Sequence, residues 1–165
     1  MITKKAHAKL NLSLDVTGKR ENAYHDIKTL MVMTDLYDEM KFSKSDKVEI
    51  EKNIPLAAGL AGGTSNGAGT FYALNELYDL KIPKKDLIKL SSSLGADFTY
   101  MMTGGSKLAS GIGEILEEVK PIELENVLIV NPGYGVSTKE VYEKIKIDDR
   151  RIDSVSYTHL RAHET

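Results

Sequence analysis

A short segment crowded with small residues, PLAAGLAGGTSNGAG at positions 55–69, has the composition of a phosphate-binding loop. Glycine permits the positive φ angles that turn successive backbone N–H groups toward one point, and small side chains let the backbone approach a polyphosphate closely. The helical pattern that follows supplies unpaired N–H groups and the positive end of a helix dipole. The segment therefore predicts phosphate binding at a helix N-terminus.

This loop does not follow the two best-known phosphate-binding patterns. No Gly-Lys-Ser/Thr follows it, as a Walker loop requires, and the dinucleotide pattern G-x-G-x-x-G is absent. The hydroxyl groups of Thr64 and Ser65 are candidates to donate to phosphate or to bind magnesium. The alternative is a glycine-rich turn or close helix packing, but so many small residues before an amphipathic helix favour phosphate binding.

Three further polar residues have types that suit group transfer. Lys9 and Asn11 alternate with apolar residues and so lie on the polar face of a predicted strand, where two solvated side chains are the simpler interpretation. Asp97 follows Gly-Ala at a predicted helix end, where a capping or turn role is the simpler interpretation. From the residues alone, both alternatives stay open.

Two aromatic side chains and a pair of glycines complete the candidates. Tyr24 and His25 could recognise a nucleobase by ring stacking and imidazole hydrogen bonds, or could form an ordinary surface loop. Gly111 and Gly113 indicate a hairpin turn. His159 and His163 have helical spacing but no accompanying glutamate or third ligand, so no zinc site is predicted.

Alternating strands and helices must position these residues. A period of two predicts a strand over residues 6–16 that ends at a Thr17–Gly18 turn, and residues 27–40 fit a helix and a strand equally well. Helices are expected over residues 65–80 and from the Ser137–Glu140 capping box. A further helix is expected from Pro83, with Leu87, Leu90 and Leu94 facing inward and Gly95 as a left-handed cap. Short strands are expected over 106–109 and 127–130. This mixture predicts an α/β or α+β domain.

The composition limits the classes of function. Of the 165 residues, 41% are apolar and 28% charged, and the net charge of −2 argues against a nucleic-acid partner. The absence of cysteine excludes thiolate chemistry, and no apolar run is long enough to span a membrane. We expect a cytoplasmic protein without a nucleic-acid or membrane partner.

Four segments in a fixed order resemble one family of small-molecule kinases, the GHMP kinases. They are AHAKLNLSLDVTGKRENAYHDI, IEKNIPLAAGLAGGTSNGAGTFYALNELYDL, LGADFTYMMTGGSKLASGIGE and PGYGVSTKEVY. Within the family, they are most similar to the kinases of 4-diphosphocytidyl-2-C-methyl-D-erythritol, which serve the non-mevalonate route to isoprenoids (terpenoids). The resemblance implies the two-layer α+β fold of a GHMP-kinase N-terminal domain, incomplete, followed by the start of a ferredoxin-like C-terminal domain.

The resemblance also implies roles for the candidate residues. Asp97 would be the catalytic base, Lys9 would stabilise charge on the transferring phosphoryl group, and Asn11 would lie near the acceptor, while Tyr24 and His25 would recognise cytosine. Mg²⁺ would accompany ATP, without an assigned protein ligand. The residues implied for ATP binding are Pro55, Leu56, Ala57, Ala58, Gly59, Leu60, Ala61, Gly62, Gly63, Thr64 and Ser65. Thr99 departs from the family, which usually has proline there.

The chain is also shorter than the family pattern. We expect the N-terminal domain over residues 1–125 with an internal deletion near 46–51, the start of the C-terminal domain over 126–153, and a non-native tail over 154–165. The implied reaction is ATP-dependent phosphorylation of the 2-hydroxyl of the cytidyl substrate. The alternatives are a homoserine or mevalonate type of GHMP kinase, or an inactive nucleotide-binding fragment.

Overall fold

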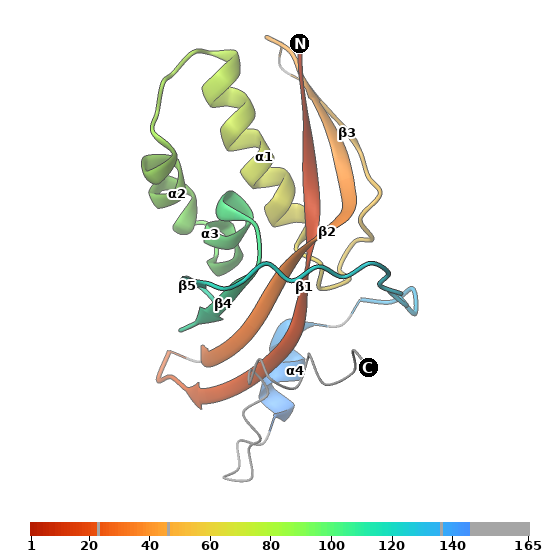
Figure 1. Ribbon diagram of the computed structural model, residues 1–165, viewed down its shortest axis with the longest axis vertical. Coiled ribbons are helices and arrows are strands. Elements are labelled where there is room, and N and C mark those ends of the chain that lie inside the picture. Colours follow the sequence, from red (N-terminus) through yellow and green to blue (C-terminus); the bar gives the residue numbers. More distant parts are fainter. Residues whose placement is uncertain (23, 46, 136, 146–165) are drawn as a thin grey trace.

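A long antiparallel hairpin, β1 (Ile2–Lys19) and β2 (His25–Phe42), is the centre of the fold. The computed structural model describes residues 1–22, 24–45, 47–135 and 137–145 (Figure 1). Within them the sheet has five strands, all antiparallel. On the edge of β2 away from β1, β3 (Val48–Glu51) pairs with the C-terminal end of β2 and β4 (Lys107–Ser110) with its N-terminal half. The fifth strand, β5 (Ile115–Glu118), pairs with β4.

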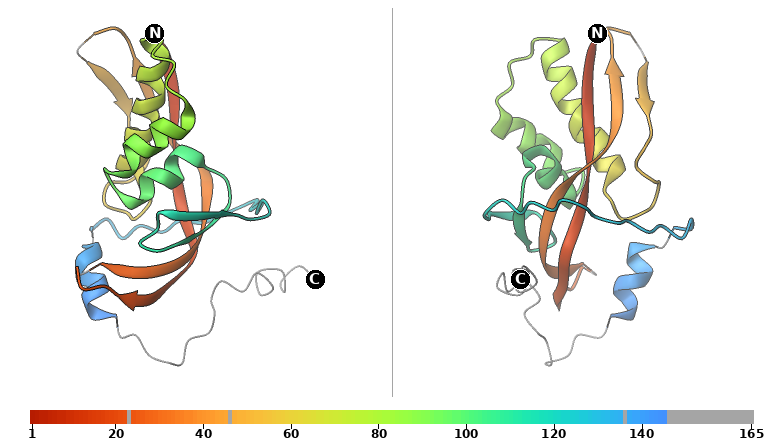
Figure 2. Two further views of the ribbon diagram at one scale, coloured as in Figure 1. Left: turned by 90° about the vertical axis from the view of Figure 1, so that its left-hand side faces the viewer. Right: turned by 45° about the vertical axis from the view of Figure 1, so that its right-hand side comes forward.

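Helices cover one face of this sheet. The helices α1 (Gly62–Leu77), α2 (Lys84–Ser92) and α3 (Ala96–Thr103) lie together on that face (Figures 1 and 2). The short helix α4 (Thr138–Lys144) lies beside the end of the hairpin where β1 and β2 join. This arrangement is a two-layer α+β fold, as the family resemblance implies.

The main core lies between the helices and the sheet. Met31 of β2 and Ala109 of β4 pack with Ala68 of α1, Leu87 of α2 and Tyr100 of α3, all of them buried. Burial of such side chains is the principal source of stability in a domain of this size. Because α1 and α3 both pack in this core and β3 pairs with β2, the segments that carry the candidate site are held against one sheet.

The ambiguous segment 27–40 is part of strand β2. Leu30, Met31 and Val32 are consecutive and all buried, so the strand is covered on both faces at its centre. A strand buried on both faces loses the alternation of apolar and polar residues that identifies a half-buried strand. This is why periodicity alone did not distinguish a strand from a helix here.

Several predicted boundaries differ in the structure. The turn expected at Thr17–Gly18 is wrong, because β1 continues and Gly18 pairs with Asp26. The chain reverses later, where the Arg20 N–H donates to the Tyr24 carbonyl at 2.8 Å. Helix α1 begins three residues before the expected Ser65.

The expected cap at Gly95 and the expected strand over residues 127–130 are both wrong. Gly95 is not a left-handed cap, since its φ of 161° is extended and it precedes α3. Residues 127–130 form no strand, and Leu128 is 89% exposed. The helix start expected at Ser137 is confirmed, because α4 begins there and the Ser137 hydroxyl accepts from the Glu140 N–H at 3.5 Å, which is one of the two bonds of a capping box. The tail 154–165, with its two histidines, is outside the described residues.

Of the three leucines expected to face inward in the second predicted helix, Leu87 is buried, whereas Leu90 and Leu94 are exposed. The hairpin turn at Gly111 and Gly113 is confirmed, because both have positive φ between β4 and β5.

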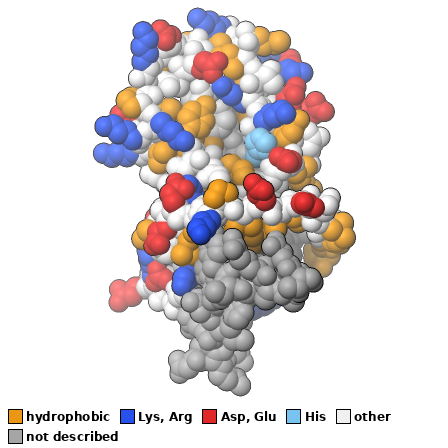
Figure 3. Space-filling view, viewed as in Figure 1, with side chains coloured by type: hydrophobic (Ala, Val, Ile, Leu, Met, Phe, Trp, Pro, Cys, Tyr) orange, Lys and Arg blue, Asp and Glu red, His pale blue; other side chains and the backbone are white. Residues whose placement is uncertain are grey.

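Lys, Arg, Asp and Glu side chains are interspersed on the face shown in Figure 3. None of the helices described here is long and apolar enough to cross a membrane.

Candidate active site

The glycine-rich loop connects β3 to the N-terminus of α1. Ala57, Gly59 and Ala61 have φ values of 53°, 73° and 55°. Left-handed residues interspersed along a loop turn backbone N–H groups toward a common point, which suits an anion. Two of the three are alanines, for which this conformation costs about 1–2 kcal/mol each. Strained backbone of this kind is typical of ligand-binding segments.

This loop encloses a cavity of about 190 Å³. Its lining consists of Lys52 and the continuous run Pro55, Leu56, Ala57, Ala58, Gly59, Leu60, Ala61, Gly62 and Gly63. The volume is below the roughly 300–1,000 Å³ that is typical of sites for whole small molecules. The described residues therefore enclose enough space for part of a nucleotide, such as its phosphate chain.

The N-terminus of α1 is open to this cavity. No side chain caps the helix at Ala61, and a methyl group added at Gly63 would meet no atom within 4 Å. Backbone N–H groups in the first turn of a helix attract anions when no side chain uses them. Thr64 and Ser65 belong to this first turn but do not line the cavity, and Ser65 is buried.

Lys52 was not among the residues singled out from the sequence. It lies directly after β3, lines the cavity, and donates from Nζ to Asp38 and, at 3.0 Å, to the Asn66 amide oxygen. A basic residue shortly before a glycine-rich loop could have been noted as a candidate partner of phosphate. No local pattern in the sequence marks Asp38, the partner of Lys52, as part of the site.

Asp38 of β2 is fully buried and holds the two ends of the loop. Its Oδ1 accepts from the N–H groups of Asn53 and Ile54 at 2.7 and 2.8 Å, and its Oδ2 accepts from Lys52 and from the Asn66 side chain. Asn53 and Ile54 begin the loop, whereas Asn66 belongs to α1. One carboxylate therefore fixes where the loop starts and where its helix begins.

These contacts also set the protonation of Asp38. Burial by itself raises the pKa of the carboxyl, but the hydrogen bonds from the Ile54 N–H, Lys52, Asn66 and the Asn53 N–H together outweigh it and hold the pKa below the ordinary value of 3.8. A lowered pKa in the folded state stabilises the fold above the ordinary value. This stabilisation is lost as the pH falls through the folded pKa.

We expect Asp38→Asn to lower the free energy of unfolding by about 1–3 kcal/mol near neutral pH, because an amide cannot accept from all four donors. The difference from the unsubstituted chain should shrink as the pH falls below 3.8, the ordinary pKa. Urea denaturation at several pH values measures both effects. Asp79→Asn is the control, since the Asp79 side chain is 79% exposed. Equal losses in the two variants would contradict this role.

The Lys9 ammonium and the Asp97 carboxylate lie together, with Nζ and Oδ1 separated by 3.5 Å. The Lys9 side chain is 6% exposed and that of Asp97, in the first turn of α3, is 36% exposed. Nζ also donates to the Asn11 side chain at 3.1 Å. A pair of opposite charges, partly removed from water, suits proton transfer and charge stabilisation.

Lys9 also contacts the glycine-rich loop through its backbone. Its N–H donates to the Leu60 carbonyl at 3.1 Å. The pairing of β1 with β2 shifts register between His7 and Lys9, and Ala8 and Lys9 are consequently both buried. The polar strand face predicted for Lys9 is therefore not solvated at this position. The irregularity places its ammonium beside Asp97 and its backbone beside the loop.

A third group of side chains lies near Asp97. The His25 ring stacks on the Tyr142 ring of α4, with centroids 5.1 Å apart and planes 28° from parallel. Burial raises the pKa of Tyr142, and the negative charge of Asp97 raises it further. Tyr142 was not selected from the sequence, although it lies in the segment PGYGVSTKEVY. Tyr24 extends into solvent and is 58% exposed.

This geometry can be compared with known proteins. The family model described as "GHMP kinases N terminal domain" matches residues 27–113, which is more than half of the chain. The chain belongs to the GHMP kinase family. Membership implies ATP as the phosphoryl donor, and the match includes the loop and Asp97.

Known GHMP kinases with similar sequences share one name. The chain is 40% identical to the 4-diphosphocytidyl-2-C-methyl-D-erythritol kinases of Thermoanaerobacter pseudethanolicus and Clostridium kluyveri, over 85% and 90% of this chain. A crystal structure of 4-(cytidine 5'-diphospho)-2C-methyl-D-erythritol kinase matches with a TM-score of 0.73 at 29% identity, over 88% of this chain and 65% of that one. Resemblance to this branch of the family is thereby confirmed.

The chain spans 61% and 66% of the length of these two GHMP kinases. The first alignment runs over 176 residues, more than the whole chain, although it covers only 85% of it. It therefore includes positions that this chain lacks. That they belong near residues 46–51 remains a proposal, as do the domain limits at 125 and 153.

Proposed function

We propose that this chain is a kinase that transfers the terminal phosphoryl group of ATP to the 2-hydroxyl of 4-diphosphocytidyl-2-C-methyl-D-erythritol. The observation that carries the proposal is the contact between Lys9 and Asp97, with Lys9 also bonded to the glycine-rich loop. These contacts bring a carboxylate, a cation and the glycine-rich loop side by side, which supports the proposal. The names of the relatives support the substrate.

In this proposal, the Asp97 carboxylate accepts the proton of the substrate's 2-hydroxyl while the hydroxyl oxygen forms a bond to the terminal phosphorus of ATP. The bond from that phosphorus to the bridging oxygen breaks, and ADP leaves with the electron pair. Lys9 stabilises the charge on the transferring group, and Asn11 holds Lys9 in place. Positioning and charge stabilisation account for most of the rate acceleration in such a reaction.

The residues of the loop fit a polyphosphate. The positive φ values, the uncapped α1 N-terminus and the Lys52 ammonium all favour negative charge in the cavity. Mg²⁺, when bound, neutralises charge on the phosphates. The hydroxyl of Thr64, in the first turn of α1, is an oxygen next to the cavity that would hold it. Action in the cytoplasm, where ATP and Mg²⁺ are available, is part of this proposal.

The recognition of the cytidyl group would fall to the aromatic residues near Asp97. The stacked rings of His25 and Tyr142 offer a flat surface for a base, and the imidazole offers hydrogen bonds to its edge. Tyr24 adjoins His25 and is exposed enough to close over a bound ring. Homoserine and mevalonate lack a base for such a surface to bind.

Turnover with different acceptors tests the proposal. The purified chain is incubated with ATP and Mg²⁺ and either the cytidyl substrate, homoserine or mevalonate, and ADP release is measured. Release that depends on the cytidyl substrate is expected. ADP release with homoserine or mevalonate, and not with the cytidyl compound, would contradict the proposed substrate.

The second candidate function is an inactive nucleotide-binding fragment. The small volume of the cavity and the positions missing relative to the longer kinases favour it. ATP binding measured by calorimetry, without ADP release for any acceptor, would establish this function instead.

His25→Leu is expected to raise the KM for the cytidyl substrate about three- to tenfold, because an aromatic stack contributes about 0.5–1.5 kcal/mol. The KM for ATP should not change, since His25 does not line the loop cavity. Steady-state kinetics with each substrate varied in turn measure both constants. A parallel rise in both KM values would indicate a general loss of structure.

A further inference from the structure

The contact between α1 and α3 contains one unusually close approach, at Gly67. A methyl group built on Gly67 would lie 2.7 Å from Cζ and 2.8 Å from Cε1 of Phe98. Real carbon atoms do not approach so closely, so no larger residue fits unless the Phe98 ring moves. Phe98 directly follows Asp97 in the first turn of α3.

The Phe98 ring, which is partly buried, has two further neighbours. It meets the Phe71 ring edge to face, with centroids 6.4 Å apart, and Phe71 lies one helical turn after Gly67 on α1. Gly95 lies at ordinary contact distance, since a methyl group there would be 3.7 Å from the ring. A methyl group on Gly67 would push the ring away from α1 and disturb these contacts, so the first turn of α3, which carries Phe98, would have to shift.

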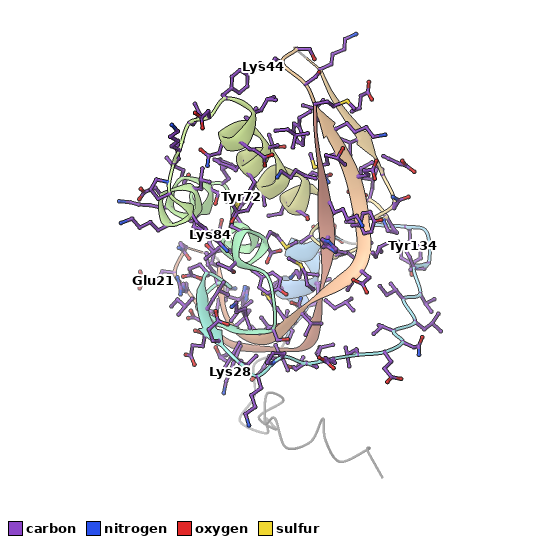
Figure 4. All side chains as sticks on the ribbon, turned by 45° about the horizontal axis from the view of Figure 1, so that its top comes forward. Glu21, Lys28, Lys44, Tyr72, Lys84 and Tyr134 are labelled. Atoms are coloured by element: carbon purple, nitrogen blue, oxygen red, sulfur yellow. The ribbon has the colours of Figure 1, made fainter. Side chains whose placement is uncertain are left out.

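A second contact ties the two helices further along. The Tyr72 hydroxyl, labelled in Figure 4, donates to the Met102 carbonyl of α3 at 2.6 Å. Ala68 packs in the same buried cluster as Tyr100 and Met102. This end of the interface therefore resists movement, and a displacement at Phe98 would be taken up by the first turn of α3, which carries Asp97.

Helix propensity does not explain the presence of glycine at position 67. Glycine is the least favourable residue after proline inside a helix. Gly67 lies inside α1, and its φ is not in the left-handed region. Alanine would therefore suit the backbone better, and the space required by Phe98 is the physical reason for glycine.

We propose that Gly67 is a positioning residue, which seats the Phe98 ring so that the Asp97 carboxylate is held at a fixed distance from the phosphate-binding end of α1. The proposal rests on the proposed function, because it assigns Asp97 the role of base. It adds that the distance between base and phosphate depends on the size of one side chain on α1.

Gly67→Ala is expected to lower kcat about ten- to a hundredfold, because small displacements of a reacting group have effects of this size. The KM for ATP should be unchanged, and the midpoint of urea unfolding should not fall by more than it does in Gly69→Ala. Gly69→Ala is the matched control on the same helix, because its methyl group would meet the flexible Met40 side chain at 3.2 Å and the Ala6 methyl group at an ordinary 3.9 Å. It should keep kcat within about twofold.

Phe98→Leu provides the compensating change. In the Gly67→Ala background it removes the overlapping ring atoms and should recover most of kcat, although Phe98→Leu alone should lower it. The proposal is overturned if Gly67→Ala retains full kcat, or if Phe98→Leu adds to its loss.

A second readout needs no turnover. In protein labelled with ¹³C-aspartate, the carboxyl resonance of Asp97, identified with Asp97→Asn, should shift in Gly67→Ala and return in the double variant. An unshifted resonance overturns the positioning role even if the chain is inactive. A shifted and restored resonance in a chain without turnover supports the positioning role and contradicts only the proposed function.

Discussion

Replacing Asp97 by Asn is expected to lower kcat about 10²–10⁴-fold, the usual contribution of a general base. The amide keeps the shape of the side chain but cannot accept the proton of the acceptor hydroxyl. The KM for ATP should change little, because Asp97 does not line the loop cavity. Steady-state ADP release, with ATP binding measured separately by calorimetry, gives both values.

Asp79→Asn is again the control for this substitution. Asp79 has a φ of 49°, a conformation that asparagine tolerates well, and its side chain is 79% exposed. This variant should retain the kcat of the unsubstituted chain. Equal rates in the Asp97→Asn protein and the unsubstituted chain would remove Asp97 from the mechanism.

Replacing Lys9 by Met is expected to lower kcat about 10²–10³-fold, the effect of losing one group that stabilises charge in the transition state. Methionine has a similar length and tolerates burial, so the fold should survive. The loss should appear in kcat more than in the KM for ATP, since the Lys9 backbone bond to Leu60 does not depend on the side chain.

Lys107→Met separates this effect from that of burying a neutral side chain. Lys107 has a side chain 8% exposed, similar to Lys9, and pairs with Glu118 across the β4–β5 hairpin. It does not contact the loop cavity. A comparable fall in kcat in both variants would show that the loss follows from disturbed packing and not from the charge at Lys9.

Much of the fold could be predicted from local patterns. The alternation over residues 6–16, the apolar stripe over 65–80 and the spacing of Ser137 and Glu140 each reflect a property of neighbouring residues, and the strand or helix that each predicts is present in the structure. Segment 27–40 could not be assigned because its centre is buried on both faces. Residues 127–130 have the composition of a strand, but no described strand pairs with them.

The candidate site was predictable to a different extent. The loop could be recognised because its small residues are consecutive, and Lys9 and Asp97 were implied by the family resemblance, not by their spacing. Asp38 and Tyr142 were missed because their neighbours come from distant positions: Asp38 binds residues up to 28 positions away, and Tyr142 stacks on a ring at position 25. Local sequence patterns do not encode such contacts.

Two contacts of Lys9 connect the glycine-rich loop and Asp97, the donor and acceptor sides of the proposed reaction, to the same residue. Its N–H holds the loop through Leu60, and its ammonium holds Asp97. A thermal displacement of this part of β1 would carry both partners with it and leave their separation nearly unchanged. In the proposed reaction, the alignment of Asp97 with the loop would therefore tolerate motion of this strand as a whole.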